Sequence, residues 1–141
     1  MSNTPRVALL GCGYWGKNLA RNLHALGALA CVCDPSELGR AKAIEIAGDI
    51  KITSEFESVF ADASIDAVAI ATPAPTHYEL AVAALRAGKD VFVEKPMTLR
   101  TAEAVQLQSH AAHYERVLMV GHLMEYHPAI QKISQLAMDG E

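Results

Sequence analysis

Three glycines near the start of the chain have the spacing of a phosphate-binding turn. Gly11, Gly13 and Gly16 follow the apolar run Val7–Leu10 in the pattern G-x-G-x-x-G. In such a turn the first glycine permits a tight bend, the second lets a pyrophosphate approach the backbone, and the third lets helix and strand pack closely. Free N–H groups at the start of the following helix would face the anion. The motif predicts a dinucleotide site; the alternative is a tight strand–helix turn without a ligand.

A carboxylate follows at the end of the next apolar run, where Asp34 lies 18 positions after Gly16. At this position it can accept hydrogen bonds from both hydroxyls of an adenosine ribose, and it would repel a 2′-phosphate. Asp34 therefore favours NAD over NADP. A second role is compatible with the first, because Asp-Pro also suits the N-cap of a helix over residues 35–47.

The loop after the fourth apolar run carries two polar side chains that could meet the same ligand. Thr72 and His77 are separated by Pro73 and Pro75, which fix the backbone and remove two donors. A stiff loop here lies beside the first strand, so Thr72 and His77 are candidate contacts for the nicotinamide half. His77 could instead be an ordinary residue in the first turn of the next helix.

The fifth apolar run ends in Glu94-Lys95-Pro96. An ionisable pair at the end of a buried strand is unfavourable unless it is paired or used, which makes these residues functional candidates. The alternative is an exposed strand end. His122, after the sixth run, would lie further along, on the side of a substrate.

Short apolar runs alternate with longer segments of helical spacing along the whole chain. The runs are mostly apolar throughout, which is typical of parallel strands covered on both faces. This predicts an α/β fold with a doubly wound parallel sheet, and the glycine motif favours the Rossmann order 3-2-1-4-5-6. The expected strands are Val7–Leu10, Ala28–Cys33, Ile50–Ile52, Ala67–Ala71, Val91–Val93 and Val117–Val120. The expected helices are Tyr14–Leu26, Pro35–Ala47, a short helix opened by a capping box at Ser54-x-x-Glu57, Thr76–Ala87, Thr101–Tyr114 with Thr101 as N-cap, and His127–Met138.

Apolar stripes predict which faces of the first two helices are buried. Trp15, Leu19 and Leu23 would pack the first helix on the sheet, and the stripe with Leu38 and Ile44 would pack the second.

The predicted strand order tests whether these pieces can share one ligand. The second and fifth strands are three steps apart, or about 14 Å at ~4.8 Å per step. That distance is comparable to an extended dinucleotide. Asp34 would then meet the adenosine, the glycine turn the pyrophosphate, and Thr72 with Lys95 the nicotinamide.

Four stretches together resemble the N-terminal half of glucose–fructose oxidoreductase and inositol dehydrogenase, the Gfo/Idh/MocA family. They are Val7–Gly16, Ala71-Thr72-Pro73 with His77, Glu94-Lys95-Pro96 and Val120-Gly121-His122. The resemblance covers essentially the whole chain and implies an NAD(P)-dependent dehydrogenase of sugars, polyols or nucleotide sugars. It implies a catalytic Lys95 that faces nicotinamide and the substrate hydroxyl, and a cis Lys95-Pro96 bond. The cofactor contacts expected from the motifs are Gly11, Gly13, Tyr14, Trp15, Gly16, Asp34, Ala71, Thr72, Pro73, His77, Glu94, Lys95 and Pro96, and the substrate contacts are Lys95 and His122.

The family also has a second domain, which supplies most of the substrate pocket. We therefore expect residues 1–141 to form one NAD(P)-binding Rossmann domain of a longer, homo-oligomeric parent, without a complete substrate site of its own. A naturally short protein that binds dinucleotide without full catalysis is the alternative.

Composition excludes several other classes of protein. With 141 residues, 51% hydrophobic and 20% charged, the chain has the core of one domain and is not disordered. A net charge of −4 argues against a nucleic-acid or anionic-membrane surface. No apolar run reaches a membrane span and the start lacks the plan of a signal peptide, so we expect a cytoplasmic protein.

The remaining candidate ligands do not form a metal site. Cys31 and Cys33 have the wrong spacing for a redox pair and read as small buried hydrophobes, as does Cys12. His110 and His113 share a helix face, but no third ligand converges on them, so we expect no metal.

Two other functions remain open. One is a noncatalytic dinucleotide-binding module, such as a redox sensor, although no basic DNA-reading helix is visible. The other is a methyltransferase, against which the glycine spacing and Glu94-Lys95-Pro96 both count.

Overall fold

The computed structural model of the protein describes residues 4–140. These residues form a six-stranded sheet in the order β3-β2-β1-β4-β5-β6, and every neighbouring pair is parallel. The strands are β1 (Val7–Leu10), β2 (Leu29–Cys33), β3 (Lys51–Thr53), β4 (Ala67–Ile70), β5 (Asp90–Val93) and β6 (Leu118–Val120). The predicted doubly wound sheet and its strand order are confirmed.

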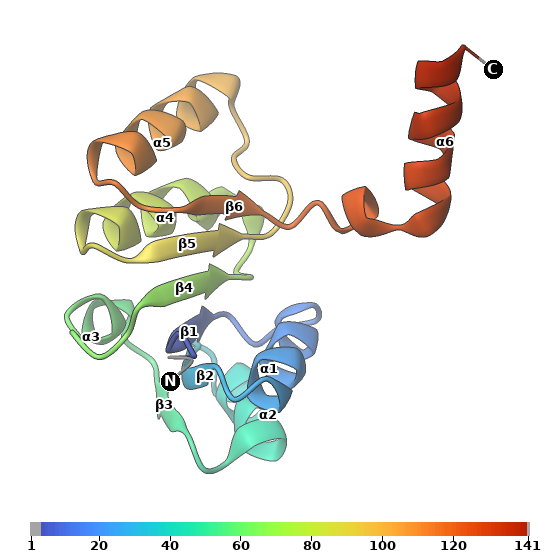
Figure 1. Ribbon diagram of the computed structural model, residues 1–141. Coiled ribbons are helices and arrows are strands. Elements are labelled where there is room, and N and C mark those ends of the chain that lie inside the picture. The colour runs from blue at the N-terminus through green and yellow to red at the C-terminus, as the bar shows by residue number, and fades with distance from the viewer. Residues whose placement is uncertain (1–3, 141) are drawn as a thin grey trace.

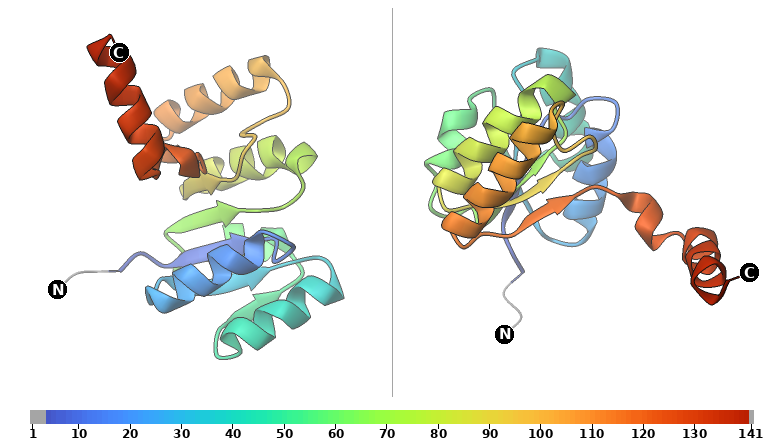
Figure 2. Two further views of the ribbon diagram at one scale, coloured as in Figure 1. Left: turned by 90° about the vertical axis from the view of Figure 1, so that its right-hand side faces the viewer. Right: turned by 90° about the horizontal axis from the view of Figure 1, so that it is seen from above.

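Helices cover both faces of this sheet (Figure 2). They are α1 (Gly16–Ala25), α2 (Glu37–Ala47), α3 (Phe56–Phe60), α4 (His77–Arg86), α5 (Thr101–His113) and α6 (Pro128–Asp139), with 3₁₀ turns η1 (Ala74–Thr76) and η2 (Leu123–Tyr126). α1 and α2 lie side by side on one face, and α4 and α5 lie side by side on the other. The strand order reverses beside β1, which is the switch point of a doubly wound fold.

The core consists of two apolar clusters, one on each face of the sheet. Cys31 and Cys33 point into the cluster under α3, α4 and α5, whereas Val32 between them points into the cluster under α1 and α2. Successive side chains of a strand alternate between faces, so an uninterrupted apolar strand supplies both clusters. All three cysteines are free and buried, as expected for small hydrophobes.

The buried face of α2 differs from the predicted one. Leu38 and Ile44 are 68% and 58% exposed, and the residues that face the sheet are Gly39, Ala43 and Ala47. A Cβ on Gly39 would lie 2.0 Å from the carboxylate of Asp34, so α2 approaches too closely for large side chains. Small size rather than hydrophobicity selects this face.

Two predicted helix caps are also wrong. α3 begins after Glu55, and the hydroxyl of Ser54 bonds the Glu55 side chain instead of closing a capping box. α5 begins at Thr101 itself, with Arg100 at the N-cap and no side-chain cap. Both errors displace a cap by one residue.

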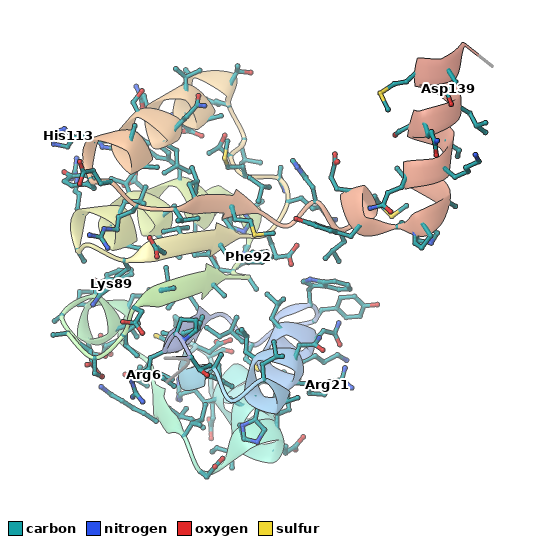
Figure 3. All side chains as sticks on the ribbon, in the orientation of Figure 1. Arg6, Arg21, Lys89, Phe92, His113 and Asp139 are labelled. Carbon is teal, nitrogen blue, oxygen red and sulfur yellow. The ribbon has the colours of Figure 1, made fainter. Side chains whose placement is uncertain are left out.

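The carboxyl ends of the strands all meet one edge of the sheet (Figure 1). In Figure 3 the label Lys89 lies just before β5 and the label Phe92 lies near its carboxyl end, and η2 and α6 lie beyond that end. α6 extends away from the sheet, and none of its residues is buried. This edge is where the predicted site residues would have to converge.

Among residues 4–140, no helix combines the length and the apolar character needed to cross a bilayer.

Candidate functional site

A cavity of about 820 Å³ opens at the carboxyl edge of the sheet. It lies among the turn before α1 and the ends of β4, β5 and β6. Its lining contains Tyr14, Trp15, Ala71, Thr72, Ala74, His77, Glu94, Lys95, Gly121, His122, Leu123, Met124 and Glu125. Eight predicted site residues are therefore brought together; Gly11, Gly13, Gly16, Asp34, Pro73 and Pro96 lie outside this lining.

The glycine turn has the geometry that its spacing predicts. Gly11 adopts φ +88°, and a Cβ there would lie 2.9 Å from the backbone nitrogen of Thr72. A Cβ on Gly16 would lie 2.0 Å from the carbonyl oxygen of Gly11, so only glycine permits this contact between helix and turn. Around Gly13, by contrast, a Cβ would meet nothing within 4 Å. The second glycine thus leaves open space beside the backbone.

The start of α1 suits an anion. Its N-cap, Trp15, makes no side-chain capping bond, and the first turn contains no acidic residue. Within the described residues, the N–H groups of Lys17 and Asn18 donate to the carbonyls of Gly13 and Trp15, whereas those of Tyr14, Trp15 and Gly16 remain for a ligand at the positive end of the helix dipole. The donor set therefore fits a pyrophosphate.

Asp34 is hydrogen-bonded to the backbone of the glycine turn. It is 7% exposed, and its Oδ2 accepts a hydrogen bond of 2.8 Å from the backbone nitrogen of Cys12. Its Oδ1 accepts from the nitrogen and the hydroxyl of Ser36. Ser36, not Asp34, is the N-cap of α2, because its hydroxyl accepts from the Gly39 nitrogen at 3.1 Å. The N-cap role predicted for Asp34 is therefore wrong. Three donors already occupy its carboxylate, so the single lone pair left on Oδ2 can accept from one ribose hydroxyl, and not from both as the sequence predicted.

His77 joins the ends of β4 and β5. It is the first residue of α4 and only 2% exposed. Its Nδ1 lies 2.8 Å from the carbonyl oxygen of Pro96, and its Nε2 lies 2.8 Å from that of Thr72. The Lys95-Pro96 bond is cis, as the resemblance implied. The ring holds two walls of the cavity at a fixed separation.

A buried carboxylate connects the glycine turn to β5. Glu94 is 7% exposed, and its Oε1 accepts a hydrogen bond of 2.7 Å from Nε1 of Trp15. Its Oε2 lies 3.4 Å from the backbone nitrogen of Lys95, and no ion pair joins the two side chains among the described residues. Glu94 thus contacts the backbone of Lys95 rather than its ammonium group.

The apolar stripe of the first helix gave a wrong prediction for Trp15. The stripe places Trp15 in the core, whereas the glycine motif makes it a cofactor contact; 41% of it is exposed and it lines the cavity. The contact with Glu94 spans 79 positions of sequence, which no local pattern reveals. The available signal was that the only tryptophan of the chain lies inside the glycine motif.

Comparison with known proteins shows to which family the chain belongs. Residues 5–122 match the family model described as an oxidoreductase family with an NAD-binding Rossmann fold, Gfo/Idh/MocA. The chain belongs to this family. The matched region includes the residues that line the cavity from Tyr14 to His122.

Several Gfo/Idh/MocA proteins are similar over most of the chain. UDP-N-acetylglucosamine 3-dehydrogenase of Acidithiobacillus ferrooxidans is 38% identical over 92% of the chain and 41% of its own length. The scyllo-inositol 2-dehydrogenase (NAD(+)) of Bacillus subtilis is 36% identical over 92% of the chain and 39% of its own length. The crystal structure of GenD2 from gentamicin A biosynthesis in complex with NAD superimposes with a TM-score of 0.90, at 33% identity, over 99% of the chain and 40% of GenD2. The chain thus spans about 40% of the length of these relatives.

The described residues of this Gfo/Idh/MocA chain contain no group of three or more potential metal ligands. His110 and His113 lie on α5, away from the cavity. Burial raises the pKa of the Cys33 thiol to about 12, helped by the nearby Cys31 and Asp34. A thiol with so high a pKa is a poor nucleophile. Cys33 is therefore not a candidate nucleophile.

Proposed function

We propose that this chain is the cofactor-binding half of a dehydrogenase that transfers hydride between a secondary alcohol and nicotinamide. The alcohol would belong to a sugar, a polyol or a nucleotide sugar. The observation that carries the proposal is that Lys95 lines the same cavity as Trp15 of the glycine turn. The names of two relatives, a UDP-N-acetylglucosamine dehydrogenase and an inositol dehydrogenase, support these substrate classes.

Different residues would contact different parts of the cofactor. The turn Gly11–Gly16, with the start of α1, would hold the pyrophosphate, and Asp34 would meet the adenosine ribose through its remaining lone pair. The nicotinamide end would lie in the cavity, near Thr72 and Glu94, with Tyr14, Ala71 and Pro73 as further contacts. His77 would act on this end mainly by fixing the Thr72 and Pro96 carbonyls. When bound, the cofactor supplies the hydride acceptor.

Lys95 would act on the substrate alcohol. Its side chain is exposed at the cavity and forms no ion pair with Glu94 among the residues described. Nζ can therefore hydrogen-bond the alcohol oxygen as hydride leaves the carbon, and accept or relay the hydroxyl proton. Accepting it requires neutral Nζ, whereas a relay passes it to another base. His122, also at the cavity, would contact the substrate.

The preference for NAD rests on Asp34. Its Oδ2 is held at the glycine turn, where a 2′-phosphate on the adenosine ribose would meet a buried negative charge. We expect thermal stabilisation of the folded chain to be greater with NAD than with NADP at equal concentration. A larger stabilisation with NADP would overturn the argument from Asp34 and leave the rest of the proposal intact.

Hydride transfer is tested in a polypeptide that carries this chain together with the region that its relatives add. NADH formation is followed with sugars, polyols and nucleotide sugars, in the wild type and in Lys95→Met. We expect the variant to remain able to bind NAD and to lose most of its turnover. Unchanged turnover in Lys95→Met would refute the role of Lys95, and a folded wild type that binds no NAD would refute the cofactor site.

A further inference from the structure

Glu94 is a carboxylate fixed at the meeting point of three strand ends. Trp15 reaches it from the β1–α1 turn, the Lys95 nitrogen from β5, and Gly121 from the end of β6. A methyl group on Gly121 would lie 3.0 Å from Oε2, so the carboxylate is packed tightly on this side. Its position is therefore set by the fold and not by solvent.

No cation within the described residues forms an ion pair with this carboxylate, and the Lys95 side chain lines the same cavity without reaching it. The ion pairs found among residues 4–140 are Lys51–Asp62 and Arg100–Glu103, both remote from the cavity. Removing a carboxylate from water without a positive partner is unfavourable. A positively charged ligand group that enters the cavity would offset that loss.

Trp15 is the kind of partner that preserves the charge. An arginine or lysine at this place would fix the carboxylate and cancel its charge at the same time. The indole Nε1–H is a neutral donor without an acceptor site, so it satisfies one oxygen of Glu94 and leaves the negative charge in place. The pair is suited to present an oriented charge that has no ion-pair partner to the cavity that both residues line.

We propose that Glu94, held by Trp15, is the counter-charge for the oxidised nicotinamide ring and makes the site prefer NAD⁺ to NADH. This inference rests on the proposed function, which puts the nicotinamide end of the cofactor in this cavity. The ring of NAD⁺ carries a positive charge and that of NADH carries none. An attraction between fixed charges in a partly desolvated site therefore acts on one form only.

A comparison of three ligands isolates the contribution of the nicotinamide ring to binding. They are NAD⁺, NADH and ADP-ribose, which has both riboses and the pyrophosphate but no nicotinamide. Their dissociation constants are measured by calorimetry for the wild type and Glu94→Gln. Glutamine keeps the shape and the acceptor for Trp15 and removes the charge. We expect Glu94→Gln to raise the dissociation constant of NAD⁺ about tenfold. The dissociation constants of NADH and ADP-ribose should change by less than about twofold.

Two variants control for charge and shape. Glu79→Gln removes the same charge from an exposed position in the first turn of α4 and should leave all three constants unchanged. Glu94→Asp keeps the charge, so it should keep the preference for NAD⁺, and it decides the question if Glu94→Gln does not fold.

The outcomes distinguish this inference from the proposed function. Equal weakening of NAD⁺, NADH and ADP-ribose in Glu94→Gln would overturn the inference, because Glu94 would then act on a ribose or on the fold. Loss of the NAD⁺ preference in Glu94→Asp would overturn it too. A folded wild type that binds none of the three ligands would overturn the proposed function itself.

Discussion

Alanine at Gly13 is expected to remove dinucleotide binding without disturbing the fold. A Cβ at this position meets nothing within 4 Å, and the residue does not need a positive φ. Alanine should even stabilise the unliganded protein by roughly 0.4–1 kcal/mol, because it restricts the unfolded chain. Its methyl group would, however, project where a pyrophosphate must approach the backbone.

The size of the effect follows from linkage between binding and folding. A ligand at 100 times its Kd adds about 2.7 kcal/mol to the free energy of unfolding. In a domain of this size each kcal/mol raises Tm by roughly 2–4 °C. Saturating NAD should therefore raise the Tm of the wild type by about 5–11 °C. In Gly13→Ala we expect no rise with NAD, and an unliganded Tm equal to that of the wild type or slightly higher.

Gly16→Ala is the matched control for this experiment. A Cβ on Gly16 would lie 2.0 Å from the Gly11 carbonyl oxygen, a backbone atom that cannot move aside. This variant should lose unliganded stability, which is measured by thermal unfolding followed by circular dichroism. A full NAD-induced rise in Gly13→Ala would refute the reasoning, as would a loss of unliganded stability like that of Gly16→Ala.

Three further predictions concern stability and pH. The hydroxyl and backbone N–H of Ser64, with Lys51, lower the pKa of Asp62 from 3.8 to about 2. Ionised Asp62 therefore stabilises the fold fully above about pH 4 and loses this effect as the pH falls to about 2. Urea unfolding should give Asp62→Asn a lower free energy of unfolding than the wild type near neutral pH, and the same free energy at the acid end. Cys33 should not react with a thiol reagent at neutral pH until the protein unfolds, and rapid labelling of the folded state would contradict its raised pKa. His77→Phe should lower the free energy of unfolding by about 1–3 kcal/mol, because a carbonyl oxygen that accepts a ring N–H loses its donor, and an unchanged denaturation midpoint would contradict its bridging role.

The parallel sheet could be predicted because its signals are local, and the glycine motif, rather than the apolar runs, indicated the strand order. Strands such as Val7–Leu10 are apolar at every position, which only a sheet covered on both faces requires. The glycine turn follows the first of them, and in a parallel sheet all strand ends meet at one edge. That edge brought Thr72, His77 and Lys95 to one cavity, as the strand order implied.

Features that depend on distances between elements could not be predicted in this way. α2 buries Gly39 and Ala43 because it lies against Asp34, and hydrophobicity alone favoured Leu38 and Ile44. Trp15 has the spacing of a core residue on α1. Its exposure follows from a hydrogen-bond acceptor that another strand supplies.

The emission of Trp15 tests most directly whether the strand ends form one dinucleotide site. Trp15 is the only tryptophan of the chain, and it lines the cavity and bonds Glu94. Indole emission overlaps the absorption of NADH, so bound NADH should quench Trp15 and emit in its place, with saturation, and excess NAD⁺ should reverse the effect. In a folded sample, Trp15 emission that neither NADH nor NAD⁺ changes would contradict the account.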